Sequence, residues 1–251
     1  MNISGNTVLI TGGATGIGYA FAEKFLAANN HVVICGRRED RLLGAKKNLP
    51  ELLFKISDLT RNEDRKELIE WAASSFDGFN VLINNAGIQR DIDFTRGADE
   101  LVSGEDEIRI NLEAPIALSA MAIPCFAGKK EAAIINVSSG LAFVPAARMP
   151  VYSATKAALH AFSMALRHQL AKIGIKVFEI VPPAVDTELN PEGRAKRGNF
   201  KAGLTSGEFV SSVMKSLQAD VFEIGYGTTE ASLRASRSEL DESFRRMNTR
   251  W

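Results

Sequence analysis

The stretch Ala132-Ala-Ile-Ile-Asn-Val-Ser-Ser139, followed after twelve residues by Tyr152-Ser-Ala-Thr-Lys156, decides the fold that we expect. The apolar run that ends at Val137 is typical of a buried strand. The second part opens a run of strong helix formers that continues to Arg167. A strand followed by a helix places the serines at the carboxyl end of the strand, where open α/β sheets place their sites.

Tyr152 and Lys156 are four residues apart, so they share one face of the predicted helix. A lysine cation about 4 Å from a phenol favours phenolate by up to roughly 4 kcal/mol, or about three pKa units. We therefore expect the pKa of Tyr152 to fall toward neutral pH, where a proton donor or acceptor works best. Taken alone, the pair is equally compatible with an ordinary helix that exposes a tyrosine and a lysine.

Length and composition are typical of one globular α/β domain. The chain has 251 residues, of which 45% are hydrophobic, and we expect residues 1–251 to form a single domain. Thirty basic residues balance thirty acidic ones, which does not favour nucleic acid or an anionic membrane as a partner. Cys35 and Cys125 lie in apolar runs, which predicts buried free thiols and neither a disulfide framework nor a metal site.

No segment has the pattern of a signal peptide or a membrane span. Residues 1–6 have neither a basic region nor an apolar core. The longest uncharged run, Ala114 to Gly128, is too short for a span and contains Pro115 and Pro124. We therefore expect a cytoplasmic protein.

A glycine-rich turn follows the first predicted strand, Thr7 to Ile10. It reads Thr11-Gly-Gly-Ala-Thr-Gly-Ile-Gly18, and an amphipathic run to Ala28 predicts a helix after it. Glycines permit a tight turn and close approach of a ligand, and the helix amino end offers free N–H groups to a diphosphate. The spacing GxxxGxG therefore indicates a dinucleotide site.

The second predicted strand, His31 to Cys35, ends in Gly36-Arg37-Arg38. An NAD site usually has an acidic residue here, which binds the ribose hydroxyls. Two guanidinium groups suit a 2′-phosphate instead, so we expect NADP(H) to be preferred over NAD(H). The alternative is that both arginines are the solvated start of a helix.

Polar residues also follow the next two predicted strands. Leu52 to Ile56 is followed by Asp58, which either lies near the adenine or caps a helix from Arg61 to about Phe76. Val81 to Ile83 leads into Asn84-Asn-Ala-Gly87, whose side-chain amides can tie neighbouring strand ends together. A long helix from Glu105 to about Phe126 carries Asn111, which would need hydrogen-bond partners if it faced the site.

In the C-terminal third, predicted strands continue to alternate with predicted helices. A sixth strand, Gly174 to Val181, ends in Pro182-Pro-Ala-Val-Asp-Thr187, and residues 188–205 form a polar segment that we expect to be a substrate loop. Then come a helix at 206–217, a short strand at 221–224, and a charged helical tail within 229–251 whose helix we place at 231–247. The whole pattern predicts a doubly wound parallel sheet of about seven strands with helices on both faces.

These motifs resemble those of the compact short-chain dehydrogenase/reductases, in order and spacing. The matched elements are Thr11-Gly12-x-x-x-Gly16-x-Gly18, Asp58, Asn84-Asn85-Ala86-Gly87, Asn111, Ser139, Tyr152-x-x-x-Lys156 and the turn from Pro182 to Thr187. Within that family, Ile88-Gln89, the stretch 139–143 and Pro182-Pro-Ala-Val-Asp-Thr187 look most like the DltE-like oxidoreductases. The resemblance implies a single NAD(P)-binding Rossmann domain.

The resemblance also implies four catalytic roles. Tyr152 would exchange the proton with the substrate oxygen, and Lys156 would lower the pKa of Tyr152 and bind the nicotinamide ribose. Ser139 would polarise the substrate carbonyl; it is preferred over Ser138 because it lies thirteen residues before the tyrosine, as in the family. Asn111 would hold a water molecule that links Lys156 to solvent.

The expected cofactor site combines the two arginines with residues that the resemblance implies. Its members are Gly12, Thr15, Gly16, Ile17, Gly18, Arg37, Arg38, Asp58, Leu59, Asn85, Ala86, Gly87, Tyr152, Lys156, Pro182, Val185 and Thr187.

Two departures from the family pattern affect these expectations. Pro183 stands where the family usually has glycine, and proline fixes φ and lacks an N–H, which affects the nicotinamide contacts. The usual glycine-rich C-terminal strand is replaced by residues 221–227 and a charged tail. Because that end often builds a tetramer in the family, we favour a homodimer through the Asn111 and Tyr152 helices over a homotetramer.

Three functions are compatible with the sequence. The first is an NADP-dependent oxidoreductase that acts on a small carbonyl or alcohol substrate, and the second is an NADP(H)-binding regulator with little turnover. The third is a hydrolase with a Ser138 or Ser139 nucleophile, but there is no G-x-S-x-G turn. His160, one turn beyond Lys156, is interpreted as a surface or interface histidine.

The substrate pocket can be placed only by chain position. Candidate apolar residues are Leu141, Phe143, Met149, Ala184 and Leu189. Candidates for an anionic group on the substrate are Arg90 and Arg194.

Overall fold

The computed structural model describes residues 1–100, 106–196, 198, 201 and 203–249. Within them, a seven-stranded parallel sheet has the strand order β3-β2-β1-β4-β5-β6-β7. The strands are β1 (Thr7–Thr11), β2 (His31–Gly36), β3 (Leu53–Ile56), β4 (Phe79–Asn84), β5 (Ala133–Val137), β6 (Lys176–Ile180) and β7 (Glu223–Ile224). The strand order reverses between β1 and β4, which is where ligands bind in such sheets.

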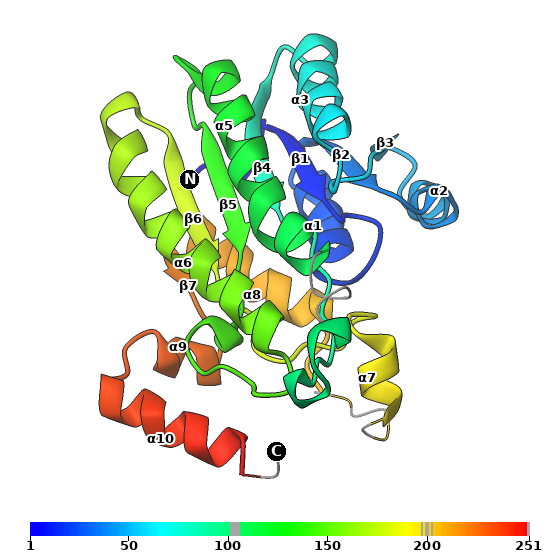
Figure 1. Cartoon of the computed structure of the whole chain (residues 1–251). Helices are drawn as coiled ribbons and strands as arrows, with labels where there is room; N and C mark the ends of the chain where they lie inside the picture. Colours follow the sequence, from blue (N-terminus) through cyan, green and yellow to red (C-terminus); the bar gives the residue numbers. More distant parts are fainter. Residues whose placement is uncertain (101–105, 197, 199–200, 202, 250–251) are drawn as a thin grey trace.

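Helices cover both faces of the sheet, as the sequence predicts (Figure 1). One layer contains α1 (Gly16–Ala27), α2 (Glu39–Asn48) and α8 (Ser206–Gln218). The other contains α3 (Asn62–Ser75), α5 (Ala114–Phe126) and α6 (Pro150–Leu170). Three further helices, α7 (Pro191–Lys196), α9 (Thr228–Ser232) and α10 (Arg237–Met247), lie at the bottom of Figure 1.

Both faces of the central strands are apolar, so the sheet is the centre of two cores. In β1, Val8 and Ile10 pack toward the layer of α1 and α8, whereas Leu9 packs toward α3 and α5. Every residue of β1, β4 and β5 is buried. Continuous apolar strands of this kind are typical of parallel sheets, in which helices exclude water from both faces.

The helix from Asp106 to Phe126 is long and apolar enough, by length and composition, to cross a membrane. It includes a π-helical turn, Arg109–Glu113, before α5. Ala114, Leu118, Ala122 and Phe126 are spaced one turn apart and are fully buried in the core on the α3 side of the sheet. Packing against the sheet therefore accounts for much of its apolar composition.

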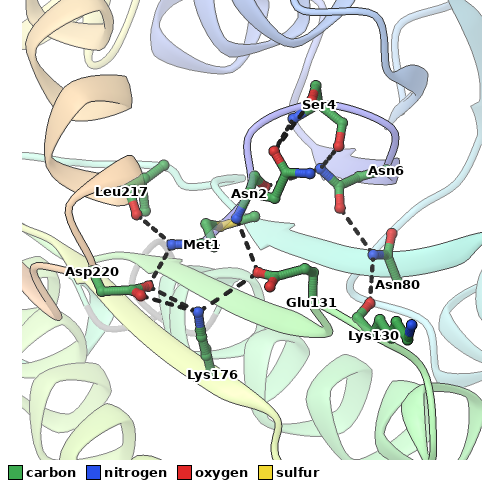
Figure 2. Close-up of polar contacts among 10 residues, drawn as sticks. All are labelled: Met1, Asn2, Ser4, Asn6, Asn80, Lys130, Glu131, Lys176, Leu217 and Asp220. Carbon is green, nitrogen blue, oxygen red and sulfur yellow. Dashed lines mark hydrogen bonds and ion pairs between the residues drawn. The ribbon is translucent and has the colours of Figure 1, made fainter.

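Polar contacts close the amino-terminal edge of the sheet (Figure 2). The Met1 amino group donates to the Leu217 carbonyl oxygen at 2.7 Å and contacts Asp220. Lys176, at the start of β6, contacts Asp220 at 3.1 Å and Glu131 at 3.6 Å. These contacts join the first residues to the end of α8 and the starts of β5 and β6, at the edge opposite the carboxyl ends of the strands.

The C-terminal tail differs from the single helix expected at 231–247. It is divided into α9 and α10, because Ser236 begins a new helix by a reciprocal capping box with Glu239. Residues 188–205 were expected to be irregular, yet they contain α7. Glu105, the expected start of the long helix, lies outside the described residues.

Both cysteines are free, as expected. Cys35 is buried, and burial raises the pKa of its thiol to about 12, whereas Cys125 is partly exposed. The expectation of burial is therefore correct for Cys35 alone.

Candidate functional site

A cleft of about 1750 Å³ runs along the carboxyl ends of the strands. Small-molecule pockets usually measure about 300–1,000 Å³, so this cleft has room for a dinucleotide and a second ligand. Most of the expected site residues line it, namely Gly12, Thr15, Gly16, Ile17, Arg37, Arg38, Leu59, Asn85, Ala86, Gly87, Ser139, Tyr152, Lys156, Pro182, Val185 and Thr187. The other three, Gly18, Asp58 and Asn111, are not among the residues that line the cleft.

The turn between β1 and α1 requires glycine at several positions. Gly12 and Gly16 have φ of +64° and +58°, which disfavour other residues. A Cβ on Gly18 would lie 2.4 Å from the Gly12 carbonyl oxygen, so glycine lets α1 approach the turn. A Cβ on Gly13, which the sequence argument did not single out, would lie 2.3 Å from Ile34. The turn thereby places the amino end of α1 at the cleft, where it suits a diphosphate.

Three arginines, not two, line the cleft beyond β2. Arg41 lies one helical turn after Arg37 and also faces the cleft. Glu188 pairs with Arg38 at 3.7 Å and with Arg41 at 3.2 Å across the opening. The basic group is therefore connected to the segment that follows β6, a contact that spacing along the sequence does not reveal.

Asp58 does not line the cleft, although its neighbours Ser57 and Leu59 do. Its carboxylate accepts hydrogen bonds from the backbone N–H and the hydroxyl of Thr60, at 3.0 and 2.9 Å. Partial burial acts to raise the pKa of Asp58, but these hydrogen bonds hold it below its ordinary value. Asp58 therefore closes a local turn with Thr60 and is not the cap of α3, whose N-cap residue is Arg61.

Asn85 ties the ends of β1 and β4 together, as predicted. Its side-chain amide donates to the carbonyl oxygens of Thr11 and Gly12 at 2.9 and 3.1 Å. The Thr11 hydroxyl accepts from the backbone N–H groups of Asn85 and Ala86, both at 3.0 Å. These contacts fix the floor of the cleft beside the glycine-rich turn.

Ser139 and Tyr152 come together at the wall of the cleft. Both side chains line it, and Ser139 acts to lower the pKa of Tyr152. Ser139 Oγ accepts from the Leu141 N–H at 3.1 Å. Ser138, the other candidate serine, donates its hydroxyl to Glu179 at 2.5 Å instead. Both serines line the cleft, and they differ in their partners.

The expectation of a lowered pKa for Tyr152 is wrong in this structure. Burial raises the pKa of Tyr152 to about 12, the bond from Ser139 acts against it, and the charge of Glu107 adds to it. Lys156 Nζ donates to the Val137 carbonyl oxygen at 2.8 Å and lies 5.6 Å from the centre of the Tyr152 ring. Burial also lowers the pKa of Lys156 to about 8, opposed by the charge of Glu179. Desolvation penalises both charged forms and here exceeds the attraction between them.

Asn111 is fully buried, and its hydrogen-bonding groups are used, as a buried amide requires. Its side chain binds both the N–H and the carbonyl oxygen of Ile88, at 2.9 and 2.8 Å. A Cβ on Gly87 would lie 3.3 Å from Asn111 Oδ1 and 3.7 Å from Lys156 Nζ. Asn111, Gly87 and Lys156 therefore converge at one point, and the π-helical turn that carries Asn111 is a distortion common at functional sites.

Two buried titratable residues near the site were not expected from the sequence. Glu107 is fully buried, accepts from the Arg90 N–H at 3.1 Å, and burial raises its pKa to about 7. Glu179 is fully buried in β6 and lies 2.7 Å from His160 Nδ1. His160 is partly exposed, at 23%, and also pairs with this buried carboxylate, a contact that its interpretation as a surface or interface histidine did not include. The signal was a glutamate within the apolar strand 175–181.

A small apolar cluster lies beside Tyr152 in the cleft. Met149 and Leu189 cluster with Tyr152, and Leu141 packs against them, whereas Phe143 packs on His160 instead. Of the proposed cationic residues, Arg194 donates to the Val185 carbonyl oxygen. Arg148, which was not expected from the sequence, lines the cleft, and its buried Nε has no hydrogen-bond partner among the residues that the structure describes.

The comparisons with known proteins agree with this geometry. A family model described as short chain dehydrogenase matches residues 6–198. A protein of Bacillus subtilis (strain 168), described as "Uncharacterized oxidoreductase DltE", is 46% identical over 249 residues, which cover 99% of both chains. An uncharacterized oxidoreductase of Staphylococcus aureus (strain MRSA252) is 33% identical over 195 residues, 75% of this chain and 83% of that protein.

Solved structures share the fold. A short chain dehydrogenase/reductase from Burkholderia phymatum in complex with NAD superposes with a TM-score of 0.85 at 19% identity, covering 96% of each chain. A short chain dehydrogenase from Burkholderia cenocepacia in complex with NADP has a TM-score of 0.82 at 26% identity, covering 97% and 99% of the two chains. One from Sphingobium yanoikuyae in complex with NADPH has a TM-score of 0.80 at 28% identity, covering 94% and 95%.

Proposed function

Since the chain belongs to the short-chain dehydrogenase family, we propose that it transfers a hydride between NADP(H) and a carbonyl or alcohol substrate. The observation that carries the proposal is that two hydroxyls, Ser139 and Tyr152, line one cleft together with the buried Lys156. These groups suit the transfer of one proton to or from a substrate oxygen.

The residues around the glycine-rich turn fit a dinucleotide. A Cβ at Gly12 would lie 2.9 Å from the Ala86 Cα, so only glycine keeps this part of the cleft open. The nicotinamide supplies the hydride when it is bound. Tyr152 is protonated at neutral pH, because its pKa is about 12, and is therefore suited to donate a proton to a carbonyl oxygen. Ser139 would hold that oxygen beside it.

Arg37, Arg38 and Arg41 support the preference for NADP(H). Three guanidinium groups at the end of β2 favour a phosphate dianion over free ribose hydroxyls. Two related structures above 25% identity are described as complexes with NADP and NADPH.

The apolar cluster beside Tyr152 supports a substrate with an apolar body. Met149 and Leu189 would contact this body next to Tyr152, and residues 188–205 would act as the substrate loop. Arg148 supports an anionic group on the same substrate, because its unpartnered Nε is a buried donor. A carbonyl acid should therefore be reduced more efficiently than its methyl ester.

We also propose a cytoplasmic homodimer in which the Asn111 and Tyr152 helices meet their copies. Ile116 on α5 and Met164 on α6 are apolar and exposed, at 39% and 50%. Burial of these side chains in an interface would be favourable.

The test is NADPH oxidation by the purified protein with a panel of aldehydes, ketones and quinones. Replacement of Tyr152 with phenylalanine should reduce turnover by about 100-fold or more, because proton transfer by a positioned group contributes 10²–10⁴-fold. NADPH binding should persist, and Tyr226→Phe, which alters a tyrosine packed against Phe209, is the matched control. Unchanged turnover in the Tyr152 variant would refute the mechanism.

The alternative is an NADP(H)-binding regulatory or partner protein with the same fold. It predicts tight NADPH binding without turnover of any compound in the panel. The presence of Asn111, Ser139, Tyr152 and Lys156 at one place favours the enzyme.

A further inference from the structure

Glu179 is a charged residue in an unusual place. It lies in β6 between Phe178 and Ile180, and its side chain is completely buried. Removal of a carboxylate from water costs several kcal/mol unless other groups compensate for the lost solvation. A hydrophobic residue would fill this place in the strand without that cost, so the partners of the carboxylate indicate its role.

Both carboxylate oxygens of Glu179 have a partner. The Ser138 hydroxyl donates to Oε1 at 2.5 Å, and His160 Nδ1 lies 2.7 Å from Oε2. The His160 side chain is 23% exposed, so the histidine separates the buried carboxylate from solvent. The acid lies between the serine and the histidine, whereas a hydrolytic triad has the histidine between the other two. The three groups therefore do not activate Ser138 as a nucleophile.

The same partners place Glu179 beside Lys156. His160 follows Lys156 by one turn of α6, and Ser138 follows Val137, whose carbonyl oxygen accepts the Lys156 hydrogen bond at 2.8 Å. Burial lowers the pKa of Lys156 to about 8, and the charge of Glu179 acts in the opposite direction. The carboxylate thus opposes the loss of the ammonium charge.

We propose that Glu179 is a positioning residue that supplies the negative charge needed to keep Lys156 in its ammonium form, with Ser138 and His160 holding the carboxylate in place. This inference rests on the proposed function, in which Lys156 assists proton transfer by Tyr152.

Other charged side chains lie around Glu179 and His160. On α6 they are Lys156, His160 and Arg167, and on β7 the charge is Glu223, which pairs with Arg167 at 2.9 Å. The hydrogen bond from Glu179 raises the pKa of His160, while Arg167 acts against it. Glu223 affects His160 but is not among the causes that shift the pKa of Lys156. This difference makes Glu223 a suitable control.

The first experiment is Glu179→Gln, which keeps the shape of the side chain and can keep both hydrogen bonds. NMR titration of protein labelled with ¹⁵N at the lysine side chains, with Lys156→Met for assignment, should show the pKa of Lys156 lowered by about one unit. The alkaline limb of the kcat/KM profile should shift to lower pH by the same amount. Turnover would then fall about tenfold at high pH and little at low pH.

Glu223→Gln should leave the Lys156 titration within about 0.3 units of the parent protein, because that charge acts mainly on His160 and Arg167. His160→Gln keeps a hydrogen-bond donor to Glu179 and leaves the negative charge of Glu179 in place. It should therefore not lower the pKa of Lys156. If Glu179→Gln does not fold, a fall in that pKa in His160→Gln would overturn the proposal by itself.

A purely structural role for Glu179 predicts a uniform loss of turnover at every pH with no change in the Lys156 titration, and that result would overturn the proposal. The NMR titration also separates this proposal from the proposed function. A shifted Lys156 titration in a protein that reduces no carbonyl compound would refute the function and keep the charge pairing. An unshifted titration in an active reductase would refute the pairing and keep the function.

Discussion

Burial controls the ionisation of the residues at the site. The pKa of Tyr152 rises to about 12 and that of Lys156 falls to about 8, with burial the largest cause of each shift. The Coulomb attraction between Tyr152 and Lys156, taken alone, predicts that the pKa of Tyr152 falls. It omits the loss of hydration of both groups, which acts in the opposite direction on the tyrosine. The nearest carboxylates, Glu107 and Glu179, then add smaller effects.

The pKa of Glu107 predicts a pH-dependent stability. In the folded protein burial raises that pKa from 4.5 to about 7, so the stabilising contribution of its proton is present below about pH 4.5 and is lost as pH rises through about 7. Glu107→Gln should therefore melt close to the parent protein at about pH 5 and roughly 2–8 °C higher at about pH 8. Scanning fluorimetry across this range is the measurement. The exposed Glu242→Gln is the control, and parallel melting curves for Glu107→Gln and the parent would contradict the prediction.

The arginines predict cofactor discrimination at the residue scale. Replacement of either Arg37 or Arg38 by glutamine should weaken NADPH binding about 10–100-fold, since one charge-assisted hydrogen bond contributes about 1.5–3 kcal/mol. NADH binding should change little, because NADH lacks the 2′-phosphate. Fluorescence titration with both cofactors measures this, with the exposed Arg245→Gln as control. Equal loss for both cofactors would show that neither arginine contacts the 2′-phosphate.

At the scale of the elements, α10 is held by contacts with a part of the chain that is distant in sequence. It lines the cleft with Leu240, Ser243 and Met247, although no residue of this helix is buried. Asn248, just after the helix, accepts from the Ala147 N–H at 2.7 Å and donates to the Pro145 carbonyl oxygen at 3.0 Å. A single side chain thus connects α10 to the segment that precedes Tyr152.

Asn248→Ala should loosen α10 and so weaken substrate binding. We expect the KM for a carbonyl substrate to rise about 3–10-fold, as two hydrogen bonds of roughly 1 kcal/mol are lost, while the Kd for NADPH stays nearly unchanged. Steady-state kinetics and hydrogen exchange of α10 measure the two effects. Thr249→Ala, which removes a hydroxyl bonded within its own helix end, is the control. Slow exchange of α10 in the Asn248 variant would contradict this role.

At the scale of the whole molecule, the two edges of the sheet differ. The amino edge is closed by the contacts of Met1, Lys176 and Asp220 (Figure 2). The cleft follows the carboxyl edge. The glycine-rich turn, the arginines and Tyr152 come from separate parts of the chain and meet only in the folded cleft. Ligand binding there should therefore stabilise the whole domain.

NADPH at about 100 times its Kd should stabilise the protein by about 2.7 kcal/mol, which corresponds to a rise in Tm of roughly 5–11 °C. NADH at the same concentration should raise the Tm less if the arginines bind the 2′-phosphate. Scanning fluorimetry with both cofactors measures the difference. Equal shifts would contradict the expected preference, and no shift with either would contradict dinucleotide binding.

The sequence by itself determined the architecture and the centre of the candidate site. Apolar runs of strand length, helical periodicity and the glycine-rich turn are local signals, and they placed seven strands in the right order along the chain. The spacing of Ser139, Tyr152 and Lys156 identified side chains that the fold brings to one cleft. These predictions succeeded because each depends on residues that are close in the chain.

Only the tertiary structure decided the remaining features. Glu179 meets Ser138 and His160, and Arg41 meets Glu188, because elements distant in sequence become neighbours. The ionisation of Tyr152 depends on how much water the surrounding helices and loops exclude, which no spacing along the chain reports. Desolvation and long-range contacts arise only when the sheet and helices pack. The folded structure therefore shows both, whereas the sequence alone does not.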